Sequence, residues 1–412
     1  MKKFKKFVTY IPFLFAVYSG FSQPITHNAE VSLLTCSSGK ELYATFGHSA
    51  IRVYDSITQT DIVFNYGVFD FNTPNFYWKF VNGKLKYQLA IQSARRFIRM
   101  YEKEGRSVIE EKIILKKEEK RDLLAYLQKN YLPENRYYLY DFFYNNCSSK
   151  IWDVTVKQVN QPLYYDSENQ GNITFRQMLY PYLKDLPWAK LGINILLGMP
   201  ADEIANFEEQ VFLPDYLSYN MSHTLREKNK NNAQSLLGPR KVLVEKKTPE
   251  HNDKLKPIRV FWIFFVLIFM LTILGVSKKI LSIIDYIIYS SAGLLGLLLT
   301  FLWFISEHQA MNANLDLLWA NPIAFLIIIS KIFSLKKINK NLTFLYLMFL
   351  IAGLVSWIFI SQYLSPVILP VILIILIRII YSLGELFHIS FIGSKLFSSN
   401  IKLYEKVRRN NS

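Results

Sequence analysis

Five long apolar runs fill the C-terminal part of the chain and limit what it can fold into. They are Val260–Val276, Tyr286–Ile305, Leu315–Ser330, Leu342–Ile360 and Pro366–Tyr381. Each run comes close to the ~20 residues that a helix needs to cross the hydrocarbon core of a bilayer. The sequence therefore predicts an all-α transmembrane domain of five helices over residues 258–394, followed by a basic cytoplasmic tail over 395–412.

The loops between these runs set the predicted orientation. Lysines or arginines follow the first, third and fifth runs, whereas the loops 306–314 and 361–365 carry none. Because basic loops stay on the cytoplasmic side, this asymmetry places the C-terminus in the cytoplasm and the region before Val260 outside. The first residues, "MKKFKKFVTYIPFLFAVYSGFSQ", have a basic head, an apolar middle and small residues, so we predict a signal peptide over 1–22, with an uncleaved anchor as the alternative.

Both patterns predict a multi-pass protein of the bacterial inner membrane whose residues 23–257 are exported to the periplasmic side. The formal net charge of +16 then comes mostly from cytoplasmic lysines and from a basic exported domain above anionic lipid headgroups. We find no aromatic-interleaved nucleic-acid motif and no phosphate-cradling glycine loop, so the sequence predicts membrane rather than nucleic acid as a partner.

The exported part alternates strand and helix patterns, which predicts an α+β domain over residues 23–226. The expected strands are 30–35, 48–54, 61–71, 86–92 and 107–115, and the expected helices are 75–83 and 116–130. Residues 227–257 are rich in Lys and Asn and have few aromatics, so we predict that much of this stretch is a flexible linker.

The chain has two cysteines, Cys36 and Cys147. In an exported domain, a disulfide between them is one expectation. The surroundings of Cys147 favour another, because Asn145 and Asn146 are good N-cap residues and "CSSKIWDVTV" can begin a helix. In the first turn, the helix dipole and the unpaired N–H groups lower the pKa of a thiol, which is typical of a nucleophile.

A nucleophilic cysteine needs a base, and His48 in "TFGHSAIRVYD" begins a well-formed strand pattern. A structural, packed histidine is the alternative. The next strand offers Asn65, in "VFNYG", to orient the imidazole, with a backbone cap as its alternative role. Weaker candidates for that position are Asp61, Asp70 and Asp141.

The stretches "FGHSAIRV", "NYGVFDF", "PENRYYLYDFFYNNCSSKIWD" and "FLPDYL", followed by several spans, resemble the bacterial Lnb family of lipoprotein N-acyltransferases. The order of a histidine strand, a polar residue on the next strand and a cysteine that begins a helix is also similar to the circularly permuted papain-like fold of the NlpC and lecithin:retinol acyltransferase-like superfamily. The resemblance to the Lnb family covers residues from about 29 to 409.

This resemblance implies a thiol acyltransferase that needs no cofactor or metal. Cys147 would take an acyl chain from a phospholipid as a thioester, and His48 would support its transfer to the N-terminal amine of a diacylglyceryl-apolipoprotein. Backbone N–H groups at the start of the helix, with Ser148, would stabilise the oxyanion. A cell-wall thiol peptidase or amidase, and a non-enzymatic envelope scaffold, are the alternative functions.

Two further groups of residues are candidates for substrate binding. The aromatic run that ends at Tyr144 either lines a slot for acyl chains or packs in the core. His308 and Asn312, in the polar segment between the second and third runs, either bind a headgroup or the acceptor or belong to a solvated loop.

Overall fold

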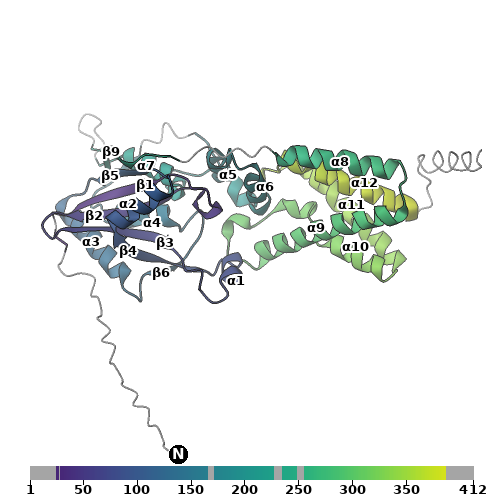
Figure 1. The fold of residues 1–412 in the computed structure, drawn as a ribbon, viewed down its shortest axis with the longest axis horizontal. Coiled ribbons are helices and arrows are strands. Elements are labelled where there is room, and N and C mark those ends of the chain that lie inside the picture. Colours follow the sequence, from purple (N-terminus) through teal and green to yellow (C-terminus); the bar gives the residue numbers. More distant parts are fainter. Residues whose placement is uncertain (1–24, 27, 166–170, 227–233, 248–254, 387–412) are drawn as a thin grey trace, which may run out of the picture.

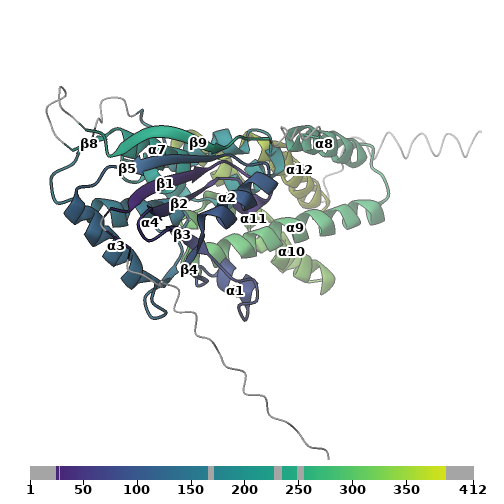
Figure 2. The same ribbon diagram turned by 60° about the vertical axis from the view of Figure 1, so that its left-hand side comes forward.

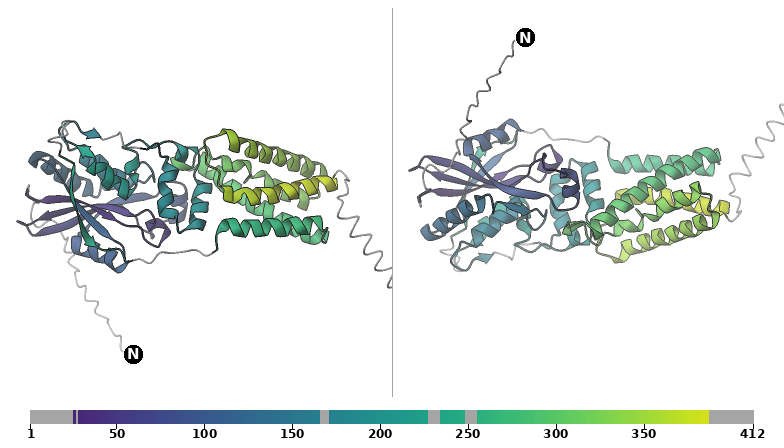
Figure 3. Two further views of the ribbon diagram at one scale, coloured as in Figure 1. Left: turned by 90° about the horizontal axis from the view of Figure 1, so that it is seen from above. Right: turned by 90° about the horizontal axis from the view of Figure 1, so that it is seen from below.

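The structure is a computed structural model with an α+β N-terminal half and a helical C-terminal half (Figure 1). It describes residues 25–26, 28–165, 171–226, 234–247 and 255–386. The predicted signal peptide and the predicted basic tail both lie outside these residues. The two halves lie end to end, as the views from above and below also show (Figure 3).

A seven-stranded antiparallel sheet forms the centre of the N-terminal half, in the order β6-β4-β3-β2-β1-β5-β9. The strands are β1 (Glu30–Cys36), β2 (His48–Asp55), β3 (Thr60–Val68), β4 (Lys86–Ser93), β5 (Val108–Ile113), β6 (Tyr137–Leu139) and β9 (Leu237–Val244). Strands β1 to β5 confirm the five strands that the sequence predicts, with shifted ends.

Apolar side chains alternate between the two faces of the sheet, and helices cover both (Figure 2). Leu33 and Ile51 pack toward α3 (Lys117–Tyr131) and α4 (Cys147–Val156) on one face. On the other face, α2 (Ala94–Lys103) covers Leu34, Ala50 and Val63. Helix α2 was not predicted from the sequence, although Ser93 caps it by accepting a hydrogen bond from the Arg96 N–H at 3.4 Å.

The remaining elements of this half connect the sheet to the C-terminal half. They are α1 (Phe76–Val81), α5 (Phe175–Leu179), α6 (Pro187–Leu196), α7 (Pro214–Ser222) and the short pair β7 (Tyr164–Tyr165) and β8 (Thr224–Leu225).

Strand β9 corrects the expectation that much of 227–257 is a flexible linker, because residues 237–244 form an edge strand paired with β5. Its central residues are exposed and only its ends are buried, so the strand lacks the alternating apolar pattern that would reveal it. Pro239 is compatible with this position because one side of an edge strand needs no ladder hydrogen bonds.

The C-terminal half contains α8 (Pro257–Ile273), α9 (Lys278–Phe304), α10 (Ile323–Ile332), α11 (Lys336–Phe359) and α12 (Leu369–Leu386). Among the described residues, three helical segments are long and apolar enough to cross a membrane, namely α9, α11 and 366–384. The expectation of five straight spans is therefore met only in part. Helix α8 is shorter, and the third apolar run bends by 49° between residues 309–318 and 323–332.

The two halves touch through loop 305–314, which follows α9. The Glu307 N–H donates to the Asn82 carbonyl at 3.1 Å, just after α1, and the Gly198 N–H donates to the Ala310 carbonyl at 2.9 Å, just after α6. Since α1 follows β3, the end of the sheet at which β2 begins and β3 ends faces the C-terminal half.

Candidate active site

Cys147 is the first residue of α4, which confirms the sequence prediction for the start of this helix. Asn146 is its N-cap, and its Oδ1 accepts hydrogen bonds from the Ser148 N–H at 2.8 Å and the Ser149 N–H at 3.0 Å. The Nδ2 of Asn146 donates to the Phe142 and Phe212 carbonyls, each at 2.8 Å. The buried Asn146 side chain thereby fixes the backbone of Cys147, which carries the thiol.

The start of α4 lies where β2 and β3 part. The pairing between these strands ends at Ile51 and Phe64, and in the described strands it does not extend to His48 and Gly67. The Ser49 N–H instead forms a hydrogen bond with Cys147. Gly67 has a φ of +85°, and a Cβ atom there would lie 3.3 Å from the Cys147 Cβ and 3.9 Å from the His48 Cε1. A glycine is thus required where the thiol and the imidazole approach the strand.

The imidazole of His48 is held by Asn65, whose Oδ1 lies 2.6 Å from the His48 Nε2. With the amide oxygen as acceptor, the Nε2–H is the donor, so Nδ1 is the nitrogen left to take a proton. The His48 side chain is also hydrogen-bonded to Cys147. The structure therefore brings Cys147, His48 and Asn65 together in one chain of hydrogen bonds.

The electrostatics of this chain favour a thiolate. Burial raises the pKa of the Cys147 thiol, but the charge and hydrogen bond of His48, the Ser49 N–H and the Ser148 hydroxyl outweigh it and bring the pKa to about 7. Burial lowers the pKa of His48, while Cys147 and the hydrogen bond that His48 donates to Asn65 raise it, and the net shift is upward. A proton thus passes readily from sulfur to imidazole.

Cys36 is a buried, unreactive thiol. Both cysteines are free, so the alternative of a disulfide between them is not found. Cys36 is only 1% exposed, and burial raises its pKa to about 12 despite the nearby Arg106. The two thiols therefore differ sharply in acidity.

Tyr138 and Tyr140, rather than Tyr144, lie beside the thiol. The pKa values of Tyr138 and Tyr140 are raised by burial and also by the charge of Cys147. The Tyr138 hydroxyl is buried, interacts with the Gly67 N–H, and lies 3.9 Å from the Cβ position of Gly67. Tyr144 is 36% exposed and packs edge-on against Phe175 with ring centroids 5.7 Å apart.

Ser148 is close to the thiol, but its hydroxyl and its backbone N–H already have hydrogen-bond partners. Its Oγ lies 2.9 Å from the Ser49 Oγ and 3.9 Å from the Cys147 Sγ. Its N–H is bonded to Asn146, so this backbone group is not free for a substrate.

His308 and Asn312 belong to the contact between the two halves. The His308 Nε2 lies 2.8 Å from the Phe80 carbonyl oxygen in α1. The Asn312 carbonyl lies directly against Gly198, and its buried Oδ1 has no partner among the described residues. The structure brings neither residue to the thiol.

The weaker carboxylate candidates all have structural partners. Asp61 forms an ion pair with Arg52 at 2.8 Å, and Asp70 and Asp141 each accept hydrogen bonds from the backbone of their own turns. In the described part of the chain, no three His, Cys, Asp or Glu side chains group as metal ligands.

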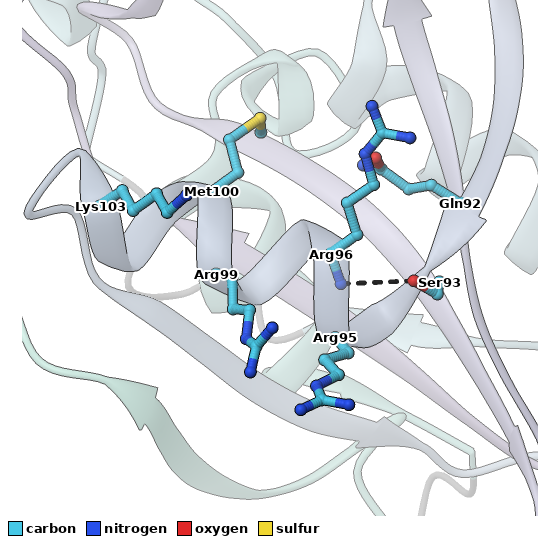
Figure 4. A pocket seen from close by; sticks show the side chains of 7 residues that line it. All are labelled: Gln92, Ser93, Arg95, Arg96, Arg99, Met100 and Lys103. Carbon is cyan, nitrogen blue, oxygen red and sulfur yellow. Dashed lines mark hydrogen bonds between the residues drawn. The ribbon is translucent and has the colours of Figure 1, made fainter.

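An open pocket on α2 has a different character (Figure 4). It is lined by Gln92, Ser93, Arg95, Arg96, Arg99, Met100 and Lys103. It is cationic and contains no nucleophile, so the hydrogen-bonded chain at Cys147 remains the candidate active site.

Comparison with known families covers both halves. Residues 23–180 match the family model of the Lnb N-terminal periplasmic domain, and residues 249–387 match that of the Lnb transmembrane domain. No curated protein and no solved structure was found to match the chain. His48, Asn65 and Cys147 all lie within the first match.

Proposed function

The chain belongs to the Lnb family, and from this premise we propose that it is a membrane-anchored thiol acyltransferase that matures lipoproteins. One observation carries the proposal: a thiol with a pKa of about 7 begins a helix beside an imidazole oriented by Asn65. This is the arrangement that forms and breaks a thioester.

In the first step, the His48 Nδ1 takes the proton of the Cys147 thiol, and the thiolate attacks an ester carbonyl of a phospholipid. The C–O bond breaks, and the leaving alkoxide takes the proton from His48 to give a lysophospholipid and an acyl thioester. In the second step, the N-terminal amine of a diacylglyceryl-apolipoprotein attacks the thioester. His48 accepts the amine proton, the C–S bond breaks, and an amide forms.

Two donors are available for the oxyanion. The Cys147 N–H has no hydrogen-bond partner among the described residues, whereas the Ser148 and Ser149 N–H groups are bonded to Asn146. The second is the Tyr138 hydroxyl, whose proton has no acceptor among the described residues. We assign these two groups to the oxyanion in place of the Ser148 backbone.

The topology supports a lipid substrate. The proposed site lies at the end of the sheet that faces the C-terminal half, and an acyl chain loses ~0.8 kcal/mol per CH₂ on leaving lipid.

We propose that α8 and the bent segment at α10 complete five spans in the inner membrane. In this topology the N-terminal half is periplasmic and the C-terminus is cytoplasmic. We also propose that the N-terminal half has the permuted papain-like order.

Mass spectrometry of lipoprotein N-terminal peptides tests the proposal. Cells with the wild-type chain are expected to yield N-acylated peptides. Cells with Cys147→Ala or His48→Ala are expected to yield peptides with free N-terminal amines. Cys36→Ala is the matched control, since it removes the buried thiol and should leave acylation intact. Unchanged acylation with Cys147→Ala, in cells that have no other N-acyltransferase, would overturn the proposal.

The same variants separate the alternatives in vitro. A cell-wall peptidase or amidase would release soluble fragments from peptidoglycan in a Cys147-dependent reaction, and a scaffold would show neither reaction. We expect lysophospholipid release that depends on both Cys147 and the acceptor amine.

A further inference from the structure

Helix α1 and the turn before it expose four large aromatic side chains. Phe71, Tyr77, Trp78 and Phe80 are 62%, 78%, 59% and 48% exposed, and we call them the α1 aromatic surface. Phe76, on the inner side of the same helix, is buried instead. A cluster of exposed rings beside a polar surface indicates a contact with another apolar phase.

The α1 aromatic surface lies beside the end of α9. The ring of Trp78 packs on Phe301 of α9 with centroids 5.3 Å apart, and α9 ends three residues later, at Phe304. The Ser306 hydroxyl donates to the Val81 carbonyl at 3.1 Å, which fixes α1 at this level. Because α9 is long and apolar enough to cross a membrane, we place the boundary between the hydrocarbon core and the headgroups near its end.

A second exposed tryptophan, Trp188, lies in the first turn of α6. Trp188 is 41% exposed and packs edge-on against Phe261, near the start of α8, with centroids 5.9 Å apart. Tryptophan and tyrosine rings concentrate at membrane interfaces because one end is apolar and the other polar. Lys84, just after α1, is exposed and forms an ion pair with Glu307 at 3.4 Å.

We propose that the α1 aromatic surface is a lipid-binding surface, embedded in the headgroup layer of the leaflet nearest the N-terminal half. Its partner is the phospholipid of that leaflet. Without lipid, the exposed rings would face water next to a membrane helix. Because Trp78 contacts α9, the α1 aromatic surface continues the lipid-facing side of that helix.

An aromatic strip links this surface to the thiol. Phe76 packs with Tyr87, and the rings of Tyr87 and Tyr140 stack with centroids 4.2 Å apart. Tyr138 is packed against the same cluster and lies next to Gly67 and Cys147. These packed rings connect α1 to the surroundings of Cys147, and we extend the proposal to the delivery of an acyl chain from the α1 aromatic surface to the thiol, a role that rests on the proposed function.

Nitroxide labels on the full chain in phospholipid nanodiscs test the lipid-binding surface. Tyr77→Cys is labelled in a Cys147→Ala background, where Cys36 is too buried to react. Ile57→Cys is the matched control, because Ile57 is 61% exposed in the turn at the opposite end of β2. We expect the label at 77 to collide with oxygen more than with a water-soluble nickel chelate, and the label at 57 to show the reverse. Equal, water-like collision profiles at both sites would overturn the proposal.

Vesicle kinetics test the delivery role. The double variant Tyr77→Ser, Trp78→Ser is expected to raise the KM for vesicular phospholipid ~10-fold through lost apolar contact, without changing the iodoacetamide reactivity of Cys147. Ile57→Ser should change neither quantity. An unchanged KM with a lipid-exposed label at 77 would overturn delivery alone, and phospholipid turnover that survives Cys147→Ala would overturn the proposed function instead.

Discussion

His48 Nε2 and Asn65 Oδ1 lie 2.6 Å apart, so the first residue of β2 is tied to the interior of β3 just where the two strands part. This hydrogen bond takes the place of backbone pairing between β2 and β3 at that point. It also fixes the imidazole ring so that Nδ1 is available to Cys147. The orientation of the proposed base thus depends on one side chain from the neighbouring strand.

Asn65→Ala should slow acyl transfer without abolishing it. The ring would lose its orientation but keep its basicity, so we expect a smaller loss than the ~10²–10⁴-fold that removal of a positioned acid–base group costs. Turnover of phospholipid by purified Asn65→Ala and His48→Ala variants measures the difference. Equal losses in both variants would mean that Asn65 does more than orient the ring.

The reactivity of Cys147 should follow its lowered pKa. Because the thiolate is the reactive form and the pKa lies at about 7, the iodoacetamide rate should rise with pH, reach half its maximum near pH 7 and fall away below it. Cys36, with a pKa of about 12 and a buried thiol, serves as an internal control that stays unlabelled. His48→Ala should move the midpoint upward, and a midpoint that stays near 7 would contradict the role of His48 in this shift.

Gly198→Ala should loosen the contact between the two halves. A Cβ atom at Gly198 would lie 1.8 Å from the Asn312 carbonyl oxygen, so backbone must move to admit it. Gly192→Ala, in α6 itself, is the matched control because nothing lies within 4 Å of its Cβ position. We expect a lower Tm for Gly198→Ala only, measured in detergent by tryptophan fluorescence, and equal Tm values would contradict the tight contact.

Arg176→Met should destabilise the part of the N-terminal half that contacts the C-terminal half. The Arg176 guanidinium contacts both carboxylate oxygens of Asp202 at 2.8 and 2.9 Å, and the Tyr363 N–H donates to the same carboxylate at 3.1 Å. Removing one partner of a buried pair costs ~3–5 kcal/mol because the other charge is left unpaired.

Arg121→Met is the control for this change, since Arg121 pairs with Asp122 on the surface and such pairs contribute only ~0–1 kcal/mol. Urea unfolding of both variants gives the comparison. A free energy of unfolding that falls equally in both would show that Arg176 makes no special contribution.

The candidate site was predictable because each of its residues has a local signal. Asn146 marks a helix start at Cys147, and His48 and Asn65 belong to strands with clear apolar alternation. What the sequence does not encode locally is the parting of β2 and β3 and the need for Gly67, because both arise from the packing of α4 against the sheet.

The substrate-binding predictions were less accurate for a similar reason. Tyr137 and Tyr144 are the ends of one eight-residue aromatic run. Only the fold decides that Tyr138 and Tyr140 approach the thiol while Tyr144 packs on Phe175. Likewise, α2 carries apolar residues at helical spacing, Ala94, Phe97 and Tyr101, but its many arginines obscured them.

The position of β9 has a consequence for how the protein is made. This strand completes the edge of the sheet beside β5, yet it comes late in the chain, shortly before Pro257 begins the first membrane helix. The sheet therefore lacks its last strand until nearly all of the residues before α8 have been synthesised and exported. Folding of the N-terminal half therefore overlaps with synthesis of the C-terminal half. The ribosome is already producing membrane segments when the N-terminal half first has all the strands that its sheet needs.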